Sequence, residues 1–149
     1  MQRLILATNN ENKLIEMRRM LYPSIPNLQS VSTFSLTVPE ETGLTYEDNA
    51  KIKADHCFSV SGEPSLADDS GIEIVGMYGG PGVESARLAP TQEERIAEIL
   101  QGLGSDSPAN LRKAKQRCVL CFKYDSNDIV YFEGVLNYST QRVLHKLIQ

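Results

Sequence analysis

The stretch from Leu66 to Arg87, LADDSGIEIVGMYGGPGVESAR, constrains the fold of this chain more than any other. In it two adjacent carboxylates, Asp68 and Asp69, follow a short apolar run and precede a Ser-Gly pair. The β-forming residues after Gly71 predict a second strand, and a glycine-rich loop follows. Two carboxylates held at a strand end by a tight turn suit Mg²⁺, which prefers oxygen ligands. Asp-Asp-Ser-Gly is also an ordinary turn sequence, so this stretch alone leaves a metal site and a plain turn both open.

Bulk composition excludes several classes of protein. A chain of 149 residues with 41% hydrophobic and 23% charged residues predicts a single folded domain over residues 1–149. A formal net charge of -4 argues against a nucleic-acid partner bound by bulk electrostatics, although a local basic cluster for a phosphorylated small molecule is permitted. No apolar run approaches the roughly 20 residues that span a bilayer. The N-terminus also lacks a signal-peptide pattern. We therefore expect no membrane association and a cytoplasmic location.

The three cysteines offer no disulfide framework. Cys118 and Cys121 form a C-x-x-C motif, but no second pair or paired histidines complete a zinc site. The run around them alternates as a strand does, so the two side chains are expected on opposite faces of a sheet. We interpret them as small hydrophobic residues.

The first twenty residues predict a strand, a polar turn and a helix. The apolar run RLILA at 3–7 indicates a buried strand, and an asparagine precedes the helical pattern that Pro23 ends. Lys13 falls in the first helical turn. Backbone N–H groups, the helix dipole and this ammonium would then converge on one anion site. A plain strand-to-helix connection with a surface lysine explains the same pattern.

The middle of the chain predicts a polar loop with Glu41 and then a helix from Thr45. Lys51 and Lys53 fall off the apolar stripe of that helix, so both are expected to be solvated charges. Thr91 begins a structural helix that Gly104 ends. Three further elements are predicted from periodicity and turn residues: strands at 118–124 and 129–136 joined as a hairpin, and a short helix at 141–148.

Three motifs together resemble the inosine/xanthosine triphosphate pyrophosphatase family, whose members remove non-standard purine nucleotides from the cell. They are ATNNENKLIE at 7–16, EETGLTYEDNAKIKA at 40–54, and the stretch at 66–87. The resemblance covers about residues 1 to 134. It implies an α/β, two-lobed, mixed-sheet fold with the nucleotide cleft between the lobes. It also implies a homodimer that uses Mg²⁺ to hydrolyse ITP, dITP or XTP to the monophosphate and pyrophosphate.

The resemblance also assigns roles to individual residues. Thr8, Asn10 and Lys13 match the triphosphate-binding T-x-N-x-x-K element, and Asn9 stands in the same loop. Glu41 matches a metal-binding glutamate.

In the same way, Lys53 matches a lysine that reaches the phosphates. Asp69 matches the residue that holds the metal and acts as general base, and Ser70 follows it at the substrate. Asp68 is a further metal candidate, bound directly or through an intermediate group.

The sequence departs from the family at two places. Glu84 stands where the family more often has an aromatic residue before SAR. After Gly134 the family's GFGYDP run, its next lysine and the purine-reading SHR element are missing, and residues 135–149 form a divergent tail. We therefore expect a C-terminally truncated or divergent member with phosphate and metal groups but no base-reading groups. The competing interpretation is a weak or inactive homologue that binds nucleotide or polyphosphate, or only dimerises.

Overall fold

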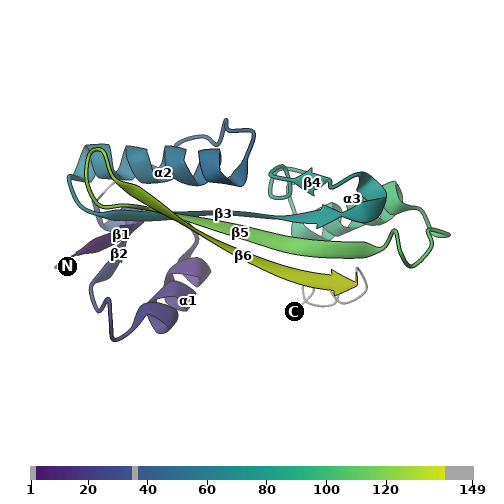
Figure 1. The fold of residues 1–149 in the computed structure, drawn as a ribbon, viewed down its shortest axis with the longest axis horizontal. Coiled ribbons are helices and arrows are strands. Elements are labelled where there is room, and N and C mark those ends of the chain that lie inside the picture. The colour runs from purple at the N-terminus through teal and green to yellow at the C-terminus, as the bar shows by residue number, and fades with distance from the viewer. Residues whose placement is uncertain (1–2, 35–36, 140–149) are drawn as a thin grey trace. The chain divides into compact units, whose positions relative to one another are not determined.

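The computed structural model describes residues 3–34 and 37–139 of the chain (Figure 1). The chain divides into two compact units, which are described one at a time. The first unit contains Met1–Asp69 and Val119–Phe132, and the second contains Ser70–Cys118 and Glu133–Gln149. A single domain over residues 1–149 stays a prediction.

Three α-helices, two short 3-10 helices and six strands make up the described residues. In chain order they are β1 (Leu4–Leu6), α1 (Glu11–Leu21), β2 (Leu28–Ser30), η1 (Val31–Phe34), α2 (Tyr46–Ser61), β3 (Ser65–Ile74), η2 (Val75–Met77), β4 (Pro81–Gly82), α3 (Gln92–Leu103), β5 (Lys113–Lys123) and β6 (Ile129–Ser139). Within these described ranges, no helix is long and apolar enough to cross a membrane.

The strands form one mixed sheet in the order β2-β1-β3-β5-β6. β1 pairs in parallel with β2, from Leu4 opposite Leu28 to Leu6 opposite Ser30. β1 also pairs in parallel with β3, where Leu6 lies opposite Leu66. The short strand β4 pairs with β3 in the antiparallel direction. A mixed α/β fold is therefore confirmed.

The first unit has a leucine-rich core between the sheet and α1. Its buried members are Leu4, Leu6, Leu14, Leu28 and Leu66. Since these residues come from β1, α1, β2 and β3, their burial fixes the helix that follows β1 against the sheet. The predicted strand and helix of the first twenty residues are confirmed.

Helix α2 begins as predicted but buries a different set of residues. The Thr45 side chain accepts a hydrogen bond from the Asp48 N–H and caps the helix. Its apolar stripe buries Ala50, Ala54 and Cys57. Lys53, expected in solvent, is instead buried. The prediction for Lys53 was wrong because it counted apolar residues only, and the carboxylate partner of the lysine lies on another segment.

The Asp-Asp-Ser-Gly segment is not a turn. It lies inside β3, a single strand of ten residues. The turn prediction rested on local hydrogen bonding by Asp and Ser, whereas both carboxylates here bond to side chains distant in sequence. Gly71 supports a close backbone approach instead, because a Cβ placed there would lie 2.1 Å from the Gly82 carbonyl oxygen of β4.

The second unit has its own core against α3. Ile74, Ile99, Leu103 and Ala114 are its buried members. A complete capping box between Thr91 and Glu94 begins α3, as predicted.

The hairpin is confirmed, although β5 and β6 are both longer than the predicted strands.

Cys121 is fully buried, and this burial raises the pKa of its thiol to about 11. Cys118 is half-buried, and neither thiol is part of a disulfide. The interpretation of these cysteines as small hydrophobic residues agrees with their burial.

β6 is the last strand of the sheet in the described part of the chain. Several of its apolar side chains are exposed, including Val130 (39%), Phe132 (55%) and Leu136 (52%). Its single charged residue, Glu133, pairs with Arg117 at 2.6 Å. The helix predicted at 141–148 lies outside the described residues.

We predict that Gly71→Ala destabilises the protein by about 1–3 kcal/mol, because the new methyl group displaces β4 from β3. Urea unfolding followed by circular dichroism measures the change. Gly134→Ala is the matched control, since a Cβ there meets nothing within 4 Å. It should stay within about 0.5 kcal/mol of the parent. Equal losses for both variants would contradict the close approach at Gly71.

We also predict that the protein associates with rising concentration. In the described residues β6 is the last strand of the sheet and carries exposed apolar side chains, and such a strand pairs readily with another chain. Light scattering over a concentration series measures the mass. Phe132→Lys should reduce association, whereas Val60→Lys, a matched change at an exposed position of α2, should not. A parent protein that stays monomeric throughout would refute the prediction.

Candidate functional site

The loop between β1 and α1 is held by its own side chains. The Thr8 hydroxyl accepts a hydrogen bond from the Asn10 N–H at 3.1 Å. Asn10 caps α1 by accepting from the N–H groups of Asn12 (3.0 Å) and Lys13 (3.3 Å). Asn9 between them is exposed. This ordered turn at a helix N-terminus is the kind of structure that binds phosphate groups.

Lys13 reaches from α1 to the middle of β3. Its Nζ lies 2.5 Å from Oδ2 of Asp68, whose side chain is 13% exposed. Burial of a carboxylate is costly without a cation or several donors. The ammonium therefore compensates Asp68, and the same contact places Lys13 next to the loop that begins with Thr8.

A second lysine–carboxylate pair lies between α2 and the loop before it. The Lys53 ammonium pairs with Oε1 of Glu41, and the Lys53 side chain is only 8% exposed. Removing one partner of such a buried pair typically costs 3–5 kcal/mol. Glu41 is thus fixed against α2, although the loop that carries it has no regular structure.

Asn49 of α2 connects that loop to β3. Its Oδ1 accepts from the Gly43 N–H at 2.7 Å, and its Nδ2 donates to Oδ2 of Asp69 at 3.1 Å. Sequence reasoning missed this residue. A signal existed, because Asn49, Lys53 and Cys57 are spaced four apart and all three are buried on one helix face.

Lys51 is not part of this arrangement. It pairs with Asp55 one turn further along α2. Burial alone would raise the pKa of Asp55, but hydrogen bonds from Lys51 and Lys123 bring that pKa below its usual value. The prediction that Lys51 is a solvated surface charge agrees with its exposure.

The two carboxylates of β3 serve different helices. Successive residues of a strand point to opposite faces, and α1 and α2 lie on opposite sides of the sheet in the first unit (Figure 1). Asp68 accordingly bonds to α1 and Asp69 to α2. Ser70, which follows them in β3, is half-buried and belongs to the second unit.

The donor set fits a hard divalent cation that takes only part of its ligands from the protein. No group of three His, Cys, Asp or Glu side chains in the described ranges is arranged to hold a metal. Mg²⁺, however, usually takes one or two carboxylates and completes its shell with water and substrate phosphates. Asp69 and Glu41 are two such carboxylates. Asn49 connects Asp69 to the loop that carries Glu41, since it bonds to both Asp69 and Gly43.

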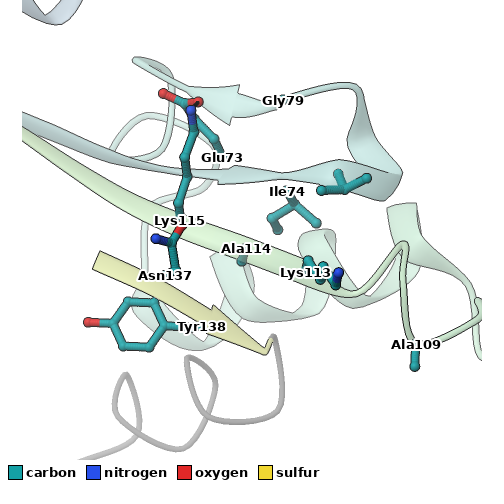
Figure 2. A pocket seen from close by; sticks show the side chains of 10 residues that line it. Glu73, Ile74, Gly79, Ala109, Lys113, Ala114, Lys115, Asn137 and Tyr138 are labelled. Atoms are coloured by element: carbon teal, nitrogen blue, oxygen red, sulfur yellow. Dashed lines mark ion pairs between the residues drawn. The ribbon is translucent and has the colours of Figure 1, made fainter. Parts of the chain in front are cut away.

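A separate cavity of about 930 Å³ lies in the second unit (Figure 2). Its apolar wall includes Ile74 and Ala114, and an ion pair between Glu73 and Lys115 (2.8 Å) crosses it. None of the residues predicted for the site lines this cavity. The site residues other than Ser70 all belong to the first unit.

Comparison with known proteins gives a consistent result. The Ham1 family matches residues 4–138. A protein named dITP/XTP pyrophosphatase from Pseudomonas syringae is 43% identical over 127 residues, which cover 84% of this chain and 64% of that protein. A protein of the same name from Brucella melitensis is 34% identical over 141 residues, which cover 89% of this chain and 64% of that protein.

Solved structures agree. A HAM1 protein from Coxiella burnetii superposes with a TM-score of 0.82 and 36% identity, over 93% of this chain and 73% of that one. The Staphylococcus aureus Ham1 protein superposes with a TM-score of 0.79 and 28% identity, over 92% of this chain and 71% of that one.

The chain spans about 64% of the length of these two pyrophosphatase relatives. The match nevertheless covers all three motifs, and side-chain contacts link the first and second motifs to the third in the first unit. The chain belongs to the Ham1 family.

Proposed function

We propose that the protein hydrolyses non-standard purine nucleoside triphosphates (ITP, dITP, XTP) to the monophosphate and pyrophosphate, with Mg²⁺ as cofactor. The observation that carries the proposal is that contacts join the three motifs: Lys13 pairs with Asp68, and Asn49, on the helix that carries Lys53, donates to Asp69. A set of lysines and carboxylates of this kind binds a triphosphate and activates water. The name of the relatives, dITP/XTP pyrophosphatase, supports dITP and XTP among these substrates.

In this proposal the chain positions the phosphates with groups that are already ordered. The backbone of the loop from Thr8 to Asn10 and the ammonium of Lys13 hold the β- and γ-phosphates, and Lys53 reaches them from α2. When phosphate oxygens approach, they compete with Asp68 and Glu41 for these two ammonium groups. Catalysis then comes mainly from orientation and electrostatic stabilisation.

Asp69 is proposed as the general base for in-line attack of water on the α-phosphorus. General-base assistance typically contributes about 10²–10⁴-fold in rate. Asp69 and Glu41 would hold Mg²⁺ on the α2 side of the sheet. Asp68 pairs with Lys13, so it would act on the cation through an intermediate group rather than bind it directly. Bound Mg²⁺ supplies neutralisation of the charge that develops on the phosphates.

The proposed setting is nucleotide-pool maintenance in the cytoplasm, by a homodimer. Its partner is a small-molecule nucleotide, without nucleic acid or membrane. The second candidate is a protein that binds nucleotide or polyphosphate with little turnover. It is favoured by the pairing of both lysines with carboxylates of the same chain, which resist exchange with a ligand.

The deciding experiment measures pyrophosphate release from dITP, XTP and ATP by the 149-residue protein, with and without Mg²⁺. We expect Mg²⁺-dependent release. Less than about tenfold preference among the bases would mean that the site does not read the base through hydrogen bonds, because such a site discriminates weakly. No release from any nucleotide, together with measurable binding, would favour the second candidate. Strong selectivity for dITP or XTP would mean that unidentified residues read the base.

We predict that Asp69→Asn abolishes hydrolysis while nucleotide binding survives. The amide keeps one oxygen that can accept from Asn49 but can neither take a proton from water nor bind Mg²⁺ as a carboxylate does. Initial rates and fluorescence titration with a nucleotide analogue measure the two properties. A rate within a few-fold of the parent at saturating Mg²⁺ would remove Asp69 from both roles.

We predict that Lys13→Ala weakens triphosphate binding by about tenfold or more and monophosphate binding less, since a hydrogen bond to a charged group contributes about 1.5–3 kcal/mol. Calorimetry without metal measures both affinities. Asp68→Asn is the matched control, because it removes the same ion pair but leaves the ammonium available. Equal losses for both ligands in Lys13→Ala would place Lys13 outside the phosphate site.

A further inference from the structure

Asn49 is a fully buried polar residue whose side-chain amide both accepts and donates a hydrogen bond. Its relative exposure is 0%. Oδ1 accepts from the backbone N–H of Gly43, and Nδ2 donates to the Asp69 carboxylate. Since a backbone N–H requires an acceptor and a carboxylate requires a donor, only one orientation of the amide satisfies both partners.

The partners of Asn49 belong to the two segments that carry the proposed cation ligands. Gly43 lies two residues after Glu41 in the loop before α2, and Asp69 lies in β3. The loop packs closely against α2 at Gly43, because an added Cβ there would lie 2.6 Å from Cβ of Asp48 and 2.7 Å from Oδ1 of Asn49. One amide therefore sets how the loop stands relative to the strand.

We propose that Asn49 is a positioning residue that holds the Asp69 carboxylate and the Glu41 loop in the placement needed to share one divalent cation. The inference rests on the proposed function for the identity of that cation's ligands. Asn49 itself touches neither cation nor nucleotide in this role. Substitution of a residue that orients a metal ligand through a hydrogen bond typically lowers metal affinity or activity by about 10–100-fold.

Two substitutions of Asn49 distinguish its hydrogen bond to Gly43 from its hydrogen bond to Asp69. Asn49→Ala removes both hydrogen bonds. Asn49→Asp keeps an acceptor for the Gly43 N–H but replaces the donor that faces Asp69 with a second carboxylate. Asn127→Asp, at an exposed position of the β5–β6 turn, introduces the same charge away from these contacts and is the matched control.

The test combines three measurements on the 149-residue protein: Mn²⁺ affinity by electron paramagnetic resonance, hydrogen exchange of the Gly43 amide, and steady-state kinetics with dITP. In Asn49→Ala we expect Mn²⁺ affinity to fall about tenfold or more, Gly43 protection to be lost, and kcat to fall with little change in KM. In Asn49→Asp, Gly43 protection should survive while kcat still falls. Asn127→Asp should match the parent in all three.

Parent-like Mn²⁺ affinity and kcat in a folded Asn49→Ala protein would overturn the proposal and leave the proposed function intact. If Asn49→Ala does not fold, a parent-like kcat in Asn49→Asp overturns it equally. A parent protein that hydrolyses no nucleotide, but whose Mn²⁺ affinity depends on Asn49, would refute the function while supporting the positioning role.

Discussion

Two adjacent carboxylates inside β3 dictate how the first unit is arranged. Neighbouring residues of a strand face opposite sides of the sheet, so Asp68 and Asp69 each need a polar partner on a different side. Lys13 of α1 supplies one and Asn49 of α2 supplies the other. The requirement to satisfy two buried charges thus fixes one side chain from each of the helices that cover the sheet.

The same requirement explains why the lysines are already paired. A buried ammonium or carboxylate is tolerated only with a close counter-charge, and Lys53 with Glu41 meets this condition beside α2. In the proposed function, a bound triphosphate would bring negative charge to Lys13 and Lys53. Binding would then be an exchange of partners within a preformed set of charges, which keeps the reorganisation of the protein small.

Several features could be read from the sequence because their causes are local. The apolar run of β1, the Asn10 cap of α1, the capping box of α3 and the turn between β5 and β6 all depend on residues within one short segment. The three motifs could also be recognised, since residue types and spacing are visible in a linear sequence. The roles of their residues are implied by resemblance, whereas the contacts among them were not visible in the sequence.

What only the tertiary structure decided concerns partners distant in sequence. The sequence indicated a turn at Asp68–Gly71, yet β4, Lys13 and Asn49 make the segment the interior of a strand. It indicated a solvated Lys53, yet Glu41 allows that residue to be buried. By itself the sequence determined the family, the mixed α/β fold and the identity of the charged residues. The structure alone decided which charges face each other, because burial and pairing depend on segments that meet only after folding.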